Sequence, residues 1–166
     1  MQILRVITCT LLVLLILAGS LHSFEYVAGS QSVDESQQVR KIIREYVRAM
    51  NRKSVEALIS LYTIDGEYVD ESFDASFSGP DQLRRLYSSI FEQNPKLTFT
   101  AFPWNIEAAG EHASVTCSWS LVGDYGVYNG VYLISMRKVS GDWKIREITA
   151  HITVVHYYNP PYLLLK

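Results

Sequence analysis

Residues 113–121 read Ala-Ser-Val-Thr-Cys-Ser-Trp-Ser-Leu, with an apolar residue at every odd position and a hydroxyl-bearing residue at every even position. A period of two places all the apolar side chains on one face of a β-strand, so one face is buried and the other is solvated. Strands of this kind are typical of antiparallel sheets. The stretch therefore predicts an antiparallel sheet that is covered on one side.

The same alternation continues on both sides of this stretch. Residues 97–102 alternate in the same way, and further strands are predicted over about 127–139 and 143–155. Glycines mark the turns that separate these strands, and the turns contain Gly110, Gly123 with Gly126, and Ser140-Gly141-Asp142. The second half of the chain is therefore predicted to be a meander of four strands.

The first half of the chain has helical periodicity instead. A capping box at residues 32–35 begins a helix that runs to about Asn51, and Ser54 begins a second, shorter helix. A strand is expected at about Glu67–Glu71, followed by a loop to Ser78. Gly79-Pro80 then begins a third helix, because proline is well suited to the first helical position.

This order predicts an α+β fold in which three N-terminal helices pack on a strongly curved antiparallel sheet. A curved sheet wrapped around helices forms a cone with an open mouth. The first helix, the first strand and the inner faces of the late strands would line that mouth.

The N-terminal segment of the chain predicts export. Residues 1–20 contain one basic residue, an apolar run and then small residues, as a signal peptide does, and residues 21–31 form a polar spacer. The alternative is that residues 6–22 stay uncleaved and anchor the protein in a membrane. The folded domain is expected over residues 32–158, with a tail at 159–166.

Charge and cysteine content exclude several classes of protein. The net charge of the 166 residues is −2, which gives no basic surface for nucleic acid. Of the two cysteines, Cys9 lies in the signal segment and Cys117 alternates with apolar residues on a strand, so an inert buried thiol is expected. No cluster of metal ligands and no cofactor motif is found, so we expect neither a metal ion nor a cofactor.

Five segments are informative when they are taken together, in their order and spacing: residues 43–51 (IREYVRAMN), Leu61-Tyr62, Tyr68-Val69-Asp70, Ser78-Gly79-Pro80, and residues 140–145 (SGDWKI). Through these segments the chain resembles, over about residues 36–155, the nuclear-transport-factor-2-like superfamily, also called SnoaL-like or ketosteroid-isomerase-like domains. The resemblance implies a cone-shaped cystatin-like fold. It also implies dimers that form through the sheet.

The resemblance to ketosteroid isomerase suggests a set of catalytic candidates. Tyr46 falls on that enzyme's oxyanion-hole tyrosine and Asp70 on its proton-shuttling aspartate, which implies a hydrogen-bond donor and a general base. The enzyme's neutral aspartic acid falls near Ser135, which is a departure from the pattern. His151, in phase with Glu147 and Thr149, could replace the missing acid if its face of the strand is the concave one.

Each of these residues also has a structural interpretation. Tyr46 could be an amphipathic core residue, Asp70 could accept hydrogen bonds from the loop at 71–78, and His151 could be a structural histidine. Residues expected to line an apolar pocket are Phe73, Trp119, Tyr132 and Ser135.

The sequence therefore predicts an exported domain that binds a small apolar molecule. The alternatives are an isomerase, cyclase or dehydratase that uses Asp70 and Tyr46, and a membrane-tethered dimerising domain.

Overall fold

The structure is a computed structural model, and it describes residues 34–158. The chain divides into two units, Met1–Glu35 and Ser36–Lys166, and the second contains the fold described here. The predicted signal peptide, the spacer, the start of the capping box at Ser32 and the tail at 159–166 lie outside the described residues. No helix within residues 34–158 has both the length and the apolar character needed to cross a membrane.

Two helices come first in the chain, and a third follows the first two strands. Residues 34–52 are helical and are called the N-terminal helix below. Helix α2 (Val55–Leu61) follows, with Ser54 at its N-cap position. Helix α3 (Gly79–Gln93) begins at the predicted Gly79-Pro80 step. Gly79 has a φ of 72°, a left-handed conformation that glycine adopts without steric cost.

The strands form one sheet of six in the order β2-β1-β6-β5-β4-β3. Their bounds are β1 Tyr62–Asp70, β2 Ala75–Ser78, β3 Thr98–Ala109, β4 His112–Val122, β5 Gly126–Val139 and β6 Asp142–Tyr157. Strands β3 to β6 pair antiparallel in sequence order, which confirms the predicted meander. The turn between β5 and β6 has positive φ at Ser140 (54°) and Gly141 (88°), as the tight turns favoured in hairpins require.

Three features of the sheet differ from the prediction. Strand β1 pairs parallel to β6, so the sheet is mixed rather than purely antiparallel. Residues 75–78, predicted as part of a loop, form strand β2 and pair antiparallel with β1 at the edge of the sheet. Strand β1 also begins at Tyr62, directly after α2, and so starts earlier than the strand predicted at about Glu67–Glu71.

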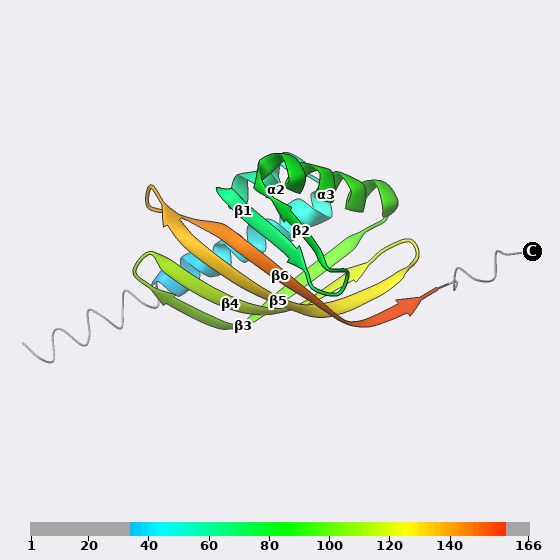
Figure 1. Cartoon of the computed structure of the whole chain (residues 1–166). Coiled ribbons are helices and arrows are strands. Elements are labelled where there is room, and N and C mark those ends of the chain that lie inside the picture. The colour runs from blue at the N-terminus through cyan, green and yellow to red at the C-terminus, as the bar shows by residue number, and fades with distance from the viewer. Residues whose placement is uncertain (1–33, 159–166) are drawn as a thin grey trace, which may run out of the picture. The chain divides into compact units, whose positions relative to one another are not determined.

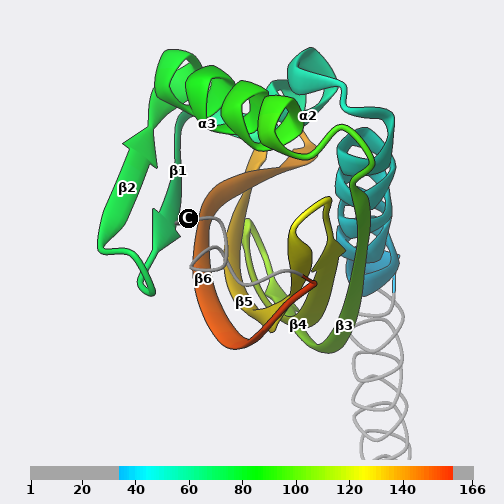
Figure 2. The ribbon, with the colours of Figure 1, turned by 90° about the vertical axis from the view of Figure 1, so that its right-hand side faces the viewer.

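The sheet curves strongly around the helices. Figure 1 shows its long strands crossing beneath α2 and α3. Figure 2 shows the sheet bending from β2 and β1 on one side to β3 on the other, where the N-terminal helix lies alongside β3. Buried apolar residues from all three helices and from the inner face of the sheet form one core. The structure is therefore the curved α+β arrangement that the sequence predicts.

Candidate functional site

Tyr46 lies in the interior, and its hydroxyl group belongs to a chain of tyrosine hydroxyls. Its Oη lies 3.1 Å from Oη of Tyr87, within hydrogen-bond distance. The Oη of Tyr87 also shares a hydrogen bond of 2.6 Å with Oη of Tyr62. The three residues come from the N-terminal helix, α3 and the start of β1. The hydroxyl group of Tyr46 is therefore already paired within the core.

Further aromatic rings surround these hydroxyls. The ring of Tyr46 makes edge contacts with the rings of Phe99 and Tyr132, at centroid distances of 5.8 and 6.4 Å. Trp119 stacks on Tyr132 at 5.1 Å. All these side chains are buried. Two of the predicted pocket residues, Trp119 and Tyr132, thus lie together with Tyr46, as parts of a packed aromatic core.

Burial changes the acidity of five tyrosines, which we call the tyrosine cluster. It raises the pKa of each of them well above the ordinary value of 10.0, and neighbouring tyrosines add to the effect; the five are Tyr46, Tyr62, Tyr68, Tyr87 and Tyr132. All five hydroxyls are therefore neutral near pH 7. In this state each can donate or accept a hydrogen bond, but none can act as a base.

Asp70 ends strand β1 and holds the turn that follows it. Its Oδ1 accepts hydrogen bonds from the backbone N–H groups of Ser72 (3.0 Å) and Phe73 (3.3 Å). This is the arrangement of an aspartate that stabilises a turn. Asp70 pairs with Ala150 of β6, and Ala150 pairs in turn with Tyr132 of β5, so Asp70 lies at the margin of the aromatic core. Burial and neighbouring tyrosines raise the pKa of Tyr68 and Tyr132, and the charge of Asp70 is the smallest of the causes.

His151 lies on the opposite face of the sheet from Tyr46. Its neighbour Ala150 is buried and pairs with Tyr132, whose ring contacts Tyr46, so the side chain of His151 points to the outer face. There its Nε2 lies 2.5 Å from Oε2 of Glu71, and both side chains are about half exposed. The structure does not bring His151 together with Tyr46.

The remaining predicted ligand-binding residues are also outside the core. Ser135 is exposed between the buried residues Ile134 and Met136, so it shares the outer face with His151. Phe73 is 71% exposed in the turn between β1 and β2. The structure thus separates the predicted site into an interior part and an outer part.

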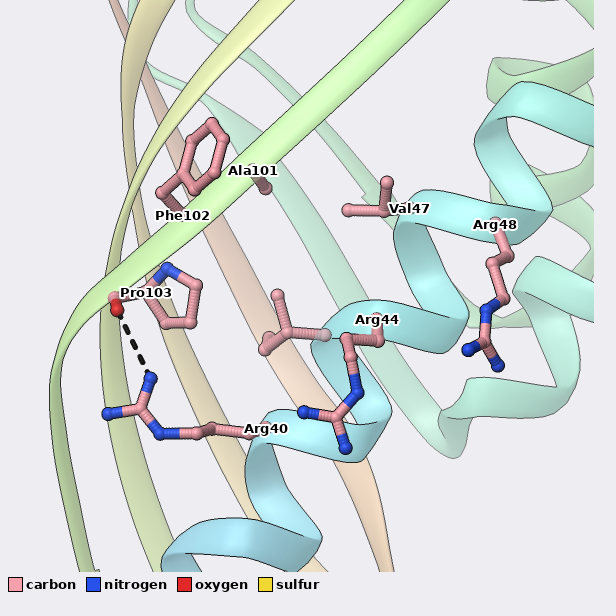
Figure 3. A pocket seen from close by; sticks show the side chains of 8 residues that line it. Arg40, Arg44, Val47, Arg48, Ala101, Phe102 and Pro103 are labelled. Carbon is pink, nitrogen blue, oxygen red and sulfur yellow. Dashed lines mark hydrogen bonds between the residues drawn. The ribbon is translucent and has the colours of Figure 1, made fainter.

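A groove of about 400 Å³ lies between the N-terminal helix and β3 (Figure 3). Its lining combines apolar side chains with three arginines: Arg40, Ile43, Arg44, Val47, Arg48, Ala101, Phe102 and Pro103. Tyr46, Asp70 and His151 do not line this groove. Arg40 donates a hydrogen bond of 3.3 Å to the carbonyl oxygen of Pro103 and so joins its two walls.

The arginines were not identified from the sequence, although their spacing was visible there. Arg40, Arg44 and Arg48 follow one another at intervals of four residues, which places them on one side of a helix. Arg44 and Arg48 are exposed, and no ion pair with a carboxylate is recorded for either among residues 34–158. The groove is therefore apolar at its base and positively charged at its rim.

The described residues support neither a cysteine nucleophile nor a metal site. Burial raises the pKa of the Cys117 thiol to about 12, so it is not a nucleophile at neutral pH. Within residues 34–158, no three His, Cys, Asp or Glu side chains gather where they could hold a metal ion.

Residues 43–154 match the family described as SnoaL-like domain. A search of curated protein sequences found no match.

Several solved structures share the fold. A candidate scytalone dehydratase from Novosphingobium aromaticivorans superposes with a TM-score of 0.70 at 18% identity, covering 77% of this chain and 90% of that one. The hexachlorocyclohexane dehydrochlorinase LinA-type3 from Novosphingobium barchaimii gives 0.68 at 12% identity, covering 78% and 97%. A protein of unknown function with a cystatin-like fold from Nostoc punctiforme gives 0.63 at 12% identity, covering 71% and 90%. At these identities the similarity shows the fold alone.

Proposed function

Because the chain belongs to the SnoaL-like domain family, whose fold hosts both enzymes and binding proteins, we propose that this domain binds a small, largely apolar molecule. The observation that carries the proposal is the groove between the N-terminal helix and β3. Its volume of about 400 Å³ falls in the range of small-molecule sites, which are mostly apolar with a few polar groups.

The positions of the catalytic candidates favour binding over chemistry. A general base and a hydrogen-bond donor must both reach one substrate. Here the hydroxyl of Tyr46 is paired with Tyr87, and the carboxylate of Asp70 holds a turn. His151 lies on the outer face, paired with Glu71. The three side chains do not converge on the groove.

The proposal can be tested with neutral apolar probes. Nile red and naphthalene are expected to bind the full chain and to raise its melting temperature, since ligands that bind only the folded state stabilise it. The variant Ala101→Phe, which places a ring in the groove, should abolish this binding. Ala109→Phe is the matched control, because Ala109 is exposed at the far end of β3. The proposal is contradicted if both variants still bind the probes. It is also contradicted if the wild-type chain binds neither probe.

The second candidate function is proton-transfer catalysis of the isomerase or dehydratase kind, with Asp70 as base and Tyr46 as donor. What favours it is that Tyr68 and Asp70 are two positions apart on β1, so a carboxylate and a neutral hydrogen-bond donor lie on the same face of the strand. Two similar structures are also named as a dehydratase and a dehydrochlorinase. Exchange of the α-protons of cyclic ketones in heavy water, followed by NMR, would test it. Exchange that Asp70→Asn abolishes would support this function, and exchange no faster than in buffer would exclude it for such substrates.

The location and assembly of the protein are further proposals. We propose export after removal of residues 1–20, and N-terminal sequencing of the protein from its host would find a start near residue 21. Uncleaved residues 6–22 would instead tether a dimerising domain to a membrane.

For assembly we propose a homodimer through the outer face of the sheet, because Phe102 and Leu133 are 69% and 48% exposed there. Light scattering should then give a dimer for the wild type and a monomer for Leu133→Glu.

A further inference from the structure

We propose that the molecule bound in the groove is an amphiphile with a carboxylate head group, held by Arg44 and Arg48 while its apolar body lies along Ile43, Val47 and Ala101. This inference rests on the proposed binding function and adds the chemical class of the ligand.

The first support is an excess of positive charge on one helix. Residues 36–52 contain five basic residues and one acidic residue, a local charge of +4, whereas the whole chain carries −2. The acidic residue, Glu45, is paired with Lys41 at 3.8 Å. No other ion pair of this stretch is recorded within the described residues. No carboxylate of residues 34–158 therefore neutralises Arg44 or Arg48.

The second support is the geometry of the arginines (Figure 3). Arg40 is held by the carbonyl oxygen of Pro103, whereas Arg44 and Arg48 extend from the same side of the helix and form no ion pair with a carboxylate of residues 34–158. Side chains four residues apart on a helix are neighbours, and two like charges there repel each other. An anion between them would remove this repulsion. The planar guanidinium group also matches the two oxygens of a carboxylate.

The third support is the apolar wall next to this charge. Val47 points from the helix toward β3, and Ala101 and Pro103 face it from the strand. A fully polar anion would leave this wall uncovered, whereas an alkyl chain would gain from its burial. A second hollow, of about 560 Å³, lies near Lys41, Glu45, Asp142 and Lys144. Charges of both signs line it, so it offers no comparable preference for an anion.

The recessed shape favours a single small molecule over a membrane surface. The groove lies between two walls, one from the helix and one from the strand, and a flat bilayer could not enter it without moving them apart. We therefore commit to a monomeric amphiphile. Vesicles of anionic phospholipid serve as the alternative occupant in the test.

The test measures displacement of Nile red from the full chain by dodecanoate, dodecanol and dodecylamine, all below their aggregation concentrations. We expect dodecanoate to bind most tightly and more weakly as salt is added, since exposed charges are screened. The double variant Arg44→Gln/Arg48→Gln should weaken dodecanoate binding by about tenfold more than it weakens the binding of dodecanol or Nile red. Arg85→Gln, an exposed arginine on α3, is the control and should change nothing.

The failures of this inference and of the proposed function can be told apart. If Nile red and dodecanol bind and Ala101→Phe abolishes their binding, the groove binds apolar molecules. Equal affinities for dodecanoate, dodecanol and dodecylamine would then contradict only the inference that the ligand has a carboxylate head group. If acetate binds as tightly as dodecanoate, the inference that the ligand is an amphiphile is contradicted. The same inference is contradicted if the protein binds anionic vesicles but does not bind dodecanoate. Dodecanoate binding that survives both Ala101→Phe and the double arginine variant would place the ligand elsewhere and overturn the site.

Discussion

The side-chain amide of Asn51 forms two hydrogen bonds with the backbone of Phe99, one in each direction. Asn51 Nδ2 donates to the Phe99 carbonyl oxygen at 2.7 Å, and the Phe99 N–H donates to Asn51 Oδ1 at 2.9 Å. The same Nδ2 donates to the carbonyl oxygen of Val47. Asn51 thus pairs with β3 much as a neighbouring strand would, and it fixes the distance between the two walls of the groove.

Asn51→Asp should destabilise the domain by about 1–3 kcal/mol, because a carboxylate cannot donate to the carbonyl oxygens of Phe99 and Val47. Chemical denaturation would measure the free energy of unfolding. Gln37→Glu is the control, since it makes the same amide-to-acid change at an exposed site of the same helix and should stay within about 0.5 kcal/mol. A similar change in both variants would contradict the role of Asn51.

The hydrogen bonds of Tyr87 predict a graded response within the tyrosine cluster. Tyr87→Phe leaves the buried hydroxyl of Tyr62 without its partner and takes one partner from Tyr46, so it should cost about 1–3 kcal/mol of stability. Tyr46→Phe should cost less, because the hydroxyl of Tyr87 keeps Tyr62 as its partner. Thermal unfolding of both variants checks the order. Naphthalene binding should be equal in both, whereas its loss in Tyr46→Phe would point to an interior ligand site.

The raised pKa values of the tyrosine cluster predict loss of stability in alkali. In the unfolded chain these tyrosines lose their protons near pH 10, while in the folded state the pKa of each is well above that. The folded state therefore binds more protons than the unfolded state above pH 10, and stability falls as the pH rises. Each such tyrosine contributes up to about 1.4 kcal/mol per pH unit.

Alkaline titration with two probes would check this result. Tyrosinate absorbance of the cluster should rise together with the loss of tertiary circular dichroism, in one cooperative transition. Ionisation of all the tyrosines near pH 10 with the fold intact would contradict the burial of the cluster.

Gly130 is expected to tolerate no side chain. A Cβ at this position would lie 2.8 Å from Cε2 and Cζ2 of Trp119 and would also meet the carbonyl oxygen of His151. Gly130→Ala should therefore cost roughly 1–3 kcal/mol through overpacking. Gly110→Ala is an informative comparison, because nothing lies within 4 Å of the added Cβ. The φ of Gly110 is 62°, however, which is unfavourable for alanine. Its cost should come from backbone strain alone, with the fluorescence of Trp119 unchanged, whereas Gly130→Ala should alter that fluorescence.

Local patterns predicted most of the fold because each of them depends on neighbours in sequence. The alternation over residues 113–121 is the inward and outward order of β4, and Gly79-Pro80 begins α3. The parallel pairing of β1 with β6 joins residues about 80 positions apart, such as Tyr68 and Ile148. No local pattern encodes such a contact. Strand β2 has only four residues, and they form a strand because they pair with β1.

The candidate site was harder to predict for the same reason. Alternation shows that Glu147, Thr149 and His151 share a face, but it does not say which face is concave. The burial of Ile148 and Ala150 decides this, and it places His151 outside. Likewise the helical period places Tyr46 inward, while its partner Tyr87 lies 41 residues away in sequence. The stripe of Arg40, Arg44 and Arg48 was visible in the sequence, but its significance depends on the strand beside it.

The central claim is that the ligand site is the groove beside β3 and that the interior of the cone is core. It is tested most directly by NMR of the methyl groups and aromatic rings during titration with naphthalene, a neutral probe that does not depend on the arginines. The account predicts that the largest shifts occur at Ile43, Val47 and Ala101. Shifts centred on Tyr46, Trp119 and Tyr132, with those of the groove unchanged, would contradict it.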